Sequence, residues 1–101
     1  MTDTCVIELP ERLDITCVEA LHLELEGALT SGKSVQLHGN HVGRMDSAGI
    51  QLVKAFYDEA AKHHQNVVWE EPSHTILEVL GLLNLGPAMG LDIDKQEKID
   101  D

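Results

Sequence analysis

The stretch Arg44–Ile50, RMDSAGI, stands in the middle of the chain, directly before the segment QLVKAFYDEAAKHH at residues 51–64. Small and apolar residues recur here at intervals of three and four: Gly49, Ile50, Val53, Phe56, Tyr57, Ala60 and Ala61. This spacing predicts a helix with one wide apolar face, which ends at Lys62-His63-His64, where cationic side chains suit the helix dipole. Because Asp and Ser are preferred at helix starts, Asp46 and Ser47 are expected to begin this helix.

Three short segments on either side of this helix are typical of β-strands. Cys5–Leu9 and Val67–Glu70 are partly β-branched and are followed by a proline, and Ser34–His38 runs into the turn residues Gly39-Asn40. We therefore expect one strand before the first helix, one before the central helix and one after it.

Two further helices complete the pattern. Thr16, with Glu19 three residues later, is a capping-box signature for the first helix, and Gly32 supplies the left-handed residue that closes it. Ser73 can cap the last helix, which the run NLGPAMG at residues 84–90 breaks. A strand-helix order repeated three times predicts an α/β fold with a mostly parallel sheet and right-handed crossovers.

The length of 101 residues predicts a single domain, and 43% apolar residues are enough to fill one interior without disulfides or metal. We expect this domain to span residues 1–91. The last ten residues, DIDKQEKIDD, are expected to form a solvated acidic tail at 92–101.

The formal net charge of −11 argues against partners that are themselves anionic. Such a chain repels phosphate backbones and anionic lipid heads, so we expect no nucleic-acid partner. The sequence has neither a basic start nor an apolar run approaching about 18 residues, which indicates a cytoplasmic protein without direct membrane insertion. Cys5 and Cys17 lack the Cys-x-x-Cys spacing of a redox or zinc site and are expected to be reduced.

Three sequence patterns resemble a nucleotide site, a metal site and a hydrolase site, but each lacks a feature that such a site requires. The segment Gly27–Ser34, GALTSGKS, matches the phosphate-loop pattern, but a helix precedes it and a strand follows, which inverts the required order. His38-x-x-His41 and His63-His64 lack the helical i, i+4 spacing of a paired metal site. A hydrolase based on Ser47 would need a nucleophile elbow and an oxyanion hole, and neither is evident. We expect no metal, no cofactor and no catalysis.

Capping alone explains Asp46 and Ser47, but it does not explain the residues around them. Gly49 costs up to about 1 kcal/mol relative to Ala inside a helix, and a helical Gly usually marks the close approach of another group. Met45 places a flexible apolar side chain just ahead of the turn, which suits an adaptable contact surface. A surface for a protein partner is therefore expected here.

A phosphoryl group on Ser47 would give this surface a switch. It would lie at the positive end of a helix, where free N–H groups bind phosphate oxygens. It would also add about two negative charges beside Asp46, so that a partner docked there would meet a desolvated dianion. The site could regulate binding without catalysing a reaction.

At these residues the sequence resembles the STAS family, the domain of bacterial anti-sigma-factor antagonists and of the cytoplasmic tails of sulfate transporters. The family motif L-x-x-x-L-D matches Leu9–Asp14, LPERLD, and D-[ST]-[SA]-G-[LI] matches Asp46–Ile50, DSAGI. The later segment ILEVLGLLNLG at residues 76–86 is similar to the apolar last helix of the family. The resemblance covers nearly the whole chain.

The resemblance implies a four- or five-stranded, mostly parallel sheet covered by three or four helices. In antagonists of this family, the hydroxyl residue after the Asp is phosphorylated by a serine kinase that is also the anti-sigma factor, and Ser47 occupies that position. The unphosphorylated form binds the kinase and releases the sigma factor, and the phosphorylated form dissociates. The expected partner-binding residues are Arg44, Met45, Asp46, Ser47, Ala48, Gly49 and Ile50.

Two other roles within the family are open. His38, Gly39 and His41 depart from the V-x-x-D-L-S approach that is common in the family. The segment at residues 67–91 looks like the stand-alone STAS proteins of chemotaxis or two-component pathways. A third role is the STAS subunit of a lipid transporter, which binds an ATPase subunit constitutively.

Overall fold

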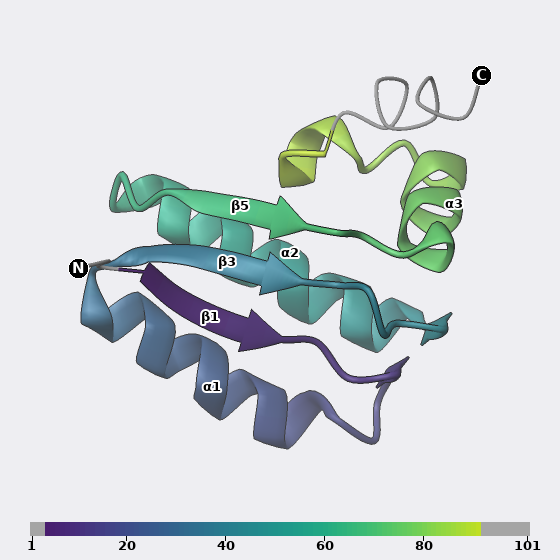
Figure 1. Cartoon of the computed structure of the whole chain (residues 1–101), viewed down its shortest axis with the longest axis horizontal. Helices are drawn as coiled ribbons and strands as arrows, with labels where there is room; N and C mark the ends of the chain where they lie inside the picture. Colours follow the sequence, from purple (N-terminus) through teal and green to yellow (C-terminus); the bar gives the residue numbers. More distant parts are fainter. Residues whose placement is uncertain (1–3, 92–101) are drawn as a thin grey trace.

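The computed structural model describes residues 4–91, so the acidic tail expected at 92–101 lies outside the described residues. Figure 1 shows three strands side by side, with helices packed along them and a last helix beyond their carboxyl ends. In chain order the elements are β1 (Thr4–Glu8), β2 (Arg12–Leu13), α1 (Val18–Ser31), β3 (Ser34–His38), β4 (Arg44–Met45), α2 (Ser47–Lys62), β5 (Val67–Glu70), α3 (His74–Leu82) and the 3-10 helix η1 (Pro87–Met89).

The main sheet has the order β1-β3-β5, and both strand pairs are parallel. Ile7, Leu37 and Trp69 are register partners across it. β2 and β4 form a second, two-stranded parallel sheet. The α/β class and the parallel strands are thus confirmed, and the five described strands are divided between two sheets.

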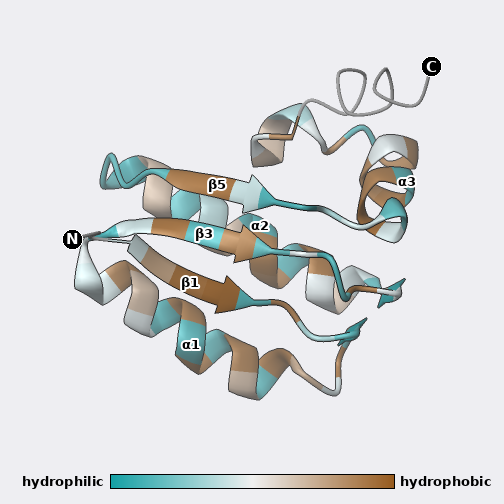
Figure 2. Cartoon of the chain, in the orientation of Figure 1, coloured by the Kyte–Doolittle hydropathy of each residue, from teal (hydrophilic) through white to brown (hydrophobic). Residues whose placement is uncertain are grey.

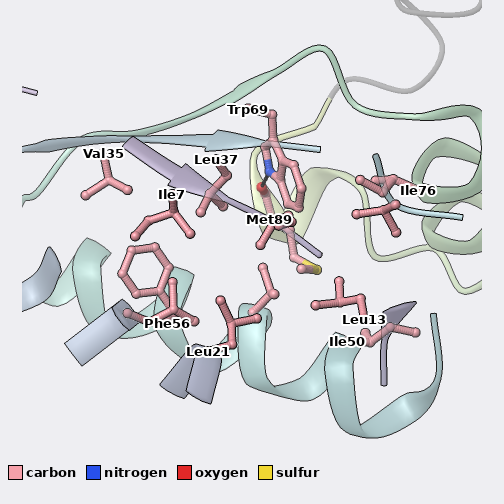
Figure 3. Packing of buried hydrophobic residues seen from close by; sticks show 14 of the residues in the cluster. Ile7, Leu13, Leu21, Val35, Leu37, Ile50, Phe56, Trp69, Ile76 and Met89 are labelled. Carbon is pink, nitrogen blue, oxygen red and sulfur yellow. Dashed lines mark hydrogen bonds between the residues drawn. The ribbon is translucent and has the colours of Figure 1, made fainter. Parts of the chain in front are cut away.

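The core lies between the main sheet and the two long helices. Figure 3 shows side chains from the strands meeting those of α1 and α2, among them Leu21 and Phe56. Both helices bury one face, as the alternation of apolar and polar residues along α1 in Figure 2 illustrates. At the end of β5, the Trp69 Nε1–H donates a buried hydrogen bond of 2.7 Å to the Met89 carbonyl, which fixes η1 against the core.

Local sequence signals located most of the elements. β3 and β5 have the expected bounds, Gly32 closes α1 with φ 70°, and the Ser73 hydroxyl accepts from Ile76 N at the start of α3. The prediction that Thr16 starts α1 with a capping box is wrong. α1 begins at Val18 after Cys17, without a side-chain cap. The Thr16 N–H, which a capping box would direct to Glu19, donates to the Asp14 carboxylate, as does the Thr16 hydroxyl.

The segment Gly27–Ser34 covers the end of α1, its Gly32 cap and the first residue of β3. It therefore runs from helix to strand, which is the reverse of a phosphate loop, as expected.

Cys5 and Cys17 are both free and half-buried. No helix within residues 4–91 is long and apolar enough to cross a membrane.

The close approach expected at Gly49 is confirmed, and its partner is the backbone of β2. A Cβ atom built on Gly49 would lie 2.0 Å from the Leu13 carbonyl oxygen. Real Cβ atoms do not approach another atom so closely, so only glycine lets α2 start against β2. By contrast, a Cβ on Gly27, in the exposed part of α1, would meet no atom within 4 Å.

We expect Gly49→Ala to lower the free energy of unfolding by at least about 2 kcal/mol, because the rigid backbone of β2 must move to admit the methyl group. Gly27→Ala is the matched control and should raise stability by about 0.5–1 kcal/mol through helix propensity. Urea unfolding followed by the fluorescence of Trp69, the single tryptophan, measures both changes. A Gly49→Ala protein as stable as the wild type would contradict this packing.

Candidate functional site

The site is built on β2 and β4, which hold two loops together at the carboxyl end of the main sheet. The N–H groups of Gly43 and Arg44 both donate to the Glu11 carbonyl, at 2.9 and 3.2 Å, and Asp46 N donates to the Leu13 carbonyl at 3.2 Å. These bonds join the loop after β1 to the loop after β3. The two family-like motifs, which are far apart in the sequence, therefore become neighbours.

Asp46 is the N-cap of α2, and its carboxylate binds two segments at once. One oxygen accepts from Gly49 N at 3.0 Å, within the first turn of α2. The other accepts from Ile15 N at 3.2 Å, in the loop that leads to α1. Hydrogen bonds to a carboxylate are stronger than those between neutral groups, so Asp46 both starts α2 and fixes its position relative to the first loop.

Ser47 is the first residue of α2, and its side chain is exposed. The first intrahelical donor of α2 is Ile50, whose N–H donates to the Asp46 carbonyl. The N–H groups of Ser47 and Ala48 precede it and have no acceptor within their own helix. The hydroxyl of Ser47 therefore lies at an exposed helix end whose first N–H groups have no acceptor among residues 4–91.

The other residues expected to bind a partner divide into an accessible set and a supporting set. Arg44 is exposed, and Met45 and Ala48 are half-buried, with Met45 packed against the core. Gly49 and Ile50 are buried. The structure thus presents Arg44 and Ser47 to solvent and places Gly49 and Ile50 beneath them.

The first loop contributes three residues that the sequence did not assign to the site, although the motif LPERLD contains or adjoins them: Arg12, Asp14 and Ile15. Ile15 is 67% exposed and places a large apolar side chain at the surface beside Asp46. The hydrogen bonds from Thr16 hold the pKa of Asp14 below its ordinary value, and the charges of Arg12 and Arg44 act in the same direction. Only the pairing of β2 with β4 brings this loop to Ser47.

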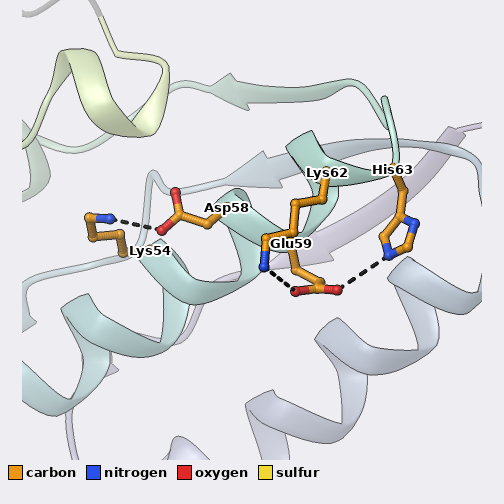
Figure 4. A network of polar contacts seen from close by, with 5 residues as sticks. All are labelled: Lys54, Asp58, Glu59, Lys62 and His63. Atoms are coloured by element: carbon orange, nitrogen blue, oxygen red, sulfur yellow. Dashed lines mark hydrogen bonds and ion pairs between the residues drawn. The ribbon is translucent and has the colours of Figure 1, made fainter.

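One histidine of each pair considered as metal ligands has ordinary polar partners. His38 lies 3.1 Å from Gln36 and 3.6 Å from Glu8, and His63 contacts Glu59 at 3.2 Å (Figure 4). Within residues 4–91, no three His, Cys, Asp or Glu side chains are grouped as a metal site would require.

Comparison with known proteins agrees with this architecture. The family model described as "Mlab, STAS domain" matches residues 2–91. The chain belongs to the STAS family. A search of curated proteins found no match.

Two similar solved structures are those of SpoIIAA. The anti-sigma factor antagonist SpoIIAA in its unphosphorylated form is 27% identical, with a TM-score of 0.69, over 86% of this chain and 77% of that one. The Bacillus cell fate determinant SpoIIAA in the phosphorylated form is 24% identical, with a TM-score of 0.67, over 98% and 93% of the two chains. The second likeness concerns the fold alone.

We expect Asp46→Ala to destabilise this STAS domain more than Ser73→Ala does. Ser73 accepts one hydrogen bond at the start of α3, and its loss should cost about 1 kcal/mol. Asp46 accepts two from different segments, so its loss should cost about 2 kcal/mol or more. Chemical denaturation of both variants measures the difference, and equal losses would mean that the bond to Ile15 contributes nothing.

Proposed function

We propose that this STAS domain is a non-enzymatic regulatory module that binds a protein partner through the surface around Arg44–Ile50. In this proposal the partner is a serine kinase that is also an anti-sigma factor, and phosphorylation of Ser47 ends the interaction. The observation that carries the proposal is the exposed Ser47 hydroxyl at the first position of α2. The likeness to the antagonist SpoIIAA supports the choice of partner.

The geometry favours a switch because it accommodates the phosphate while changing the surface. A phosphoryl group on Ser47 would lie at the amino end of a 16-residue helix, where the dipole stabilises negative charge. The same group would stand among Ala48, Met45 and the exposed Ile15, which offer a docked partner apolar contact. Burying a dianion against such contacts is costly, so the modified form should dissociate.

A second candidate is a subunit that binds its partner constitutively, in a chemotaxis or two-component pathway or with the ATPase of a lipid transporter. The family description supports this candidate, since it names Mlab and not an antagonist. Both candidates use the same surface. They differ in whether charge at residue 47 controls binding.

The test compares Ser47→Asp with Ser47→Ala. The binding protein is first recovered with tagged wild-type chain from the cells that naturally make it, identified by mass spectrometry and purified. Calorimetry should then show that Ser47→Asp weakens binding at least about tenfold, because it adds charge to a surface that is desolvated in the complex, and that Ser47→Ala preserves binding.

Ser34→Asp is the matched control, because Ser34 is an exposed serine at the opposite end of β3. It introduces the same charge away from the site and should leave the affinity unchanged. Equal affinities for all three variants would refute the switch and favour the constitutive subunit. If Ser47→Asp and Ser34→Asp weakened partner binding equally, the overall charge of the protein would explain the loss, and the switch at Ser47 would also be refuted.

A further inference from the structure

The chain contains two arginines, Arg12 and Arg44, and the fold places them side by side. They are register partners of the parallel pair β2–β4, so their backbones lie one strand spacing apart. Both side chains are exposed, whereas their neighbours Leu13 and Met45 point inward, Leu13 with 0% exposure. Two guanidinium groups therefore share the outer side of this small sheet.

These arginines form no ion pair within the described part of the protein, although their charges reach Asp14. Between residues 4 and 91 no carboxylate oxygen lies within 4.0 Å of either guanidinium, although the sequence has 18 acidic residues. The lysines of α2 behave differently, since Lys54 pairs with Asp58 at 2.8 Å and Lys62 with Glu59 at 3.8 Å (Figure 4). Like charges opposite each other on adjacent strands repel, so the pair is an unfavourable arrangement that an anion would relieve.

Glu11, Asp14 and Asp46 are the carboxylates nearest in the chain to these arginines, and none of them lies within 4.0 Å of either guanidinium group. Asp14 accepts both hydrogen bonds of Thr16, and Asp46 accepts from Gly49 and Ile15. Since no carboxylate of residues 4–91 pairs with them, the arginine donors can bind another anionic group. Arg44 lies three residues before Ser47, so at most about 10 Å of chain separates the two Cα atoms.

We propose that Arg12 and Arg44 together bind the phosphoryl group on Ser47. This inference rests on the proposed phosphorylation of that residue and names the groups that receive the phosphate. Guanidinium groups bind phosphate oxygens through paired, parallel N–H donors, and a phosphoserine offers three acceptor oxygens. Phosphorylation then changes the surface twice: it adds a dianion, and it withdraws two arginine side chains from contact with a partner.

Phosphorus NMR tests this inference without a partner or a kinase. Phosphoserine is incorporated at position 47 of the full chain by codon reassignment, and the second pKa of its phosphate is measured by pH titration. In the otherwise wild-type chain this pKa should lie about one unit below the ordinary value of about 6, because two cations stabilise the dianion. The double variant Arg12→Gln/Arg44→Gln should raise it by about one unit relative to the otherwise wild-type chain, because only the contribution of the helix end remains.

Lys33→Gln/Lys62→Gln is the matched control, since it removes the same charge elsewhere. Lys62 ends α2, about 22 Å along the helix axis from Ser47, and Lys33 adjoins the start of β3. This control should leave the phosphate pKa unchanged, and Trp69 fluorescence verifies that each variant is folded. The inference fails if the arginine variant titrates like the wild type, or if both double variants shift the pKa equally.

The result of the phosphate titration can be distinguished from the result of the partner-binding test. Phosphoserine is incorporated during translation in every sample, so the arginine result holds whether or not a kinase acts on Ser47. Unchanged partner affinity in Ser47→Asp would overturn the switch and leave the arginine site standing. An unshifted phosphate pKa would overturn the arginine site and leave the switch standing.

Discussion

The contact between Gly49 and the Leu13 carbonyl determines where α2 can begin, and the rest of the site depends on that position. The missing side chain lets the first turn of α2 lie directly against β2. Asp46 then reaches both Gly49 N and Ile15 N, and this locks the turn to the first loop. A larger residue at position 49 would separate the two loops and remove the geometry on which the carboxylate bridge depends.

Within the seven residues Arg44–Ile50, some side chains are buried and hold the start of α2 in place, and others are exposed to solvent. Gly49 and Ile50 are buried and hold the helix start in place, while Ser47 and Arg44 face solvent. A rigid frame beneath an accessible hydroxyl suits a protein whose binding is changed by a small covalent modification. The phosphorylation that we propose at Ser47 need not alter the fold, because it would act through charge at a surface that is already formed.

Sequence patterns predicted the parts of this fold that depend on neighbours along the chain. The bounds of β3 and β5, the Gly32 closure and the Ser73 cap all follow from local residue types. β2 and β4 have two residues each, too few for any periodicity, and they exist because they pair with each other. The Thr16 capping box failed because Asp14 offered a nearer acceptor. Gly49 was identifiable as a close approach, but its partner Leu13 and the neighbouring Arg12 could be found only through this pairing.

Amide hydrogen exchange measured by NMR tests the central claim most directly, namely that Asp46 fixes the start of α2 while Ser47 stays accessible. The N–H groups of Gly49 and Ile15 should exchange at least about tenfold more slowly than those of Ser47 and Ala48, because only the first two donate to the Asp46 carboxylate. Similar rates for all four amides, or strong protection of Ser47, would contradict the account.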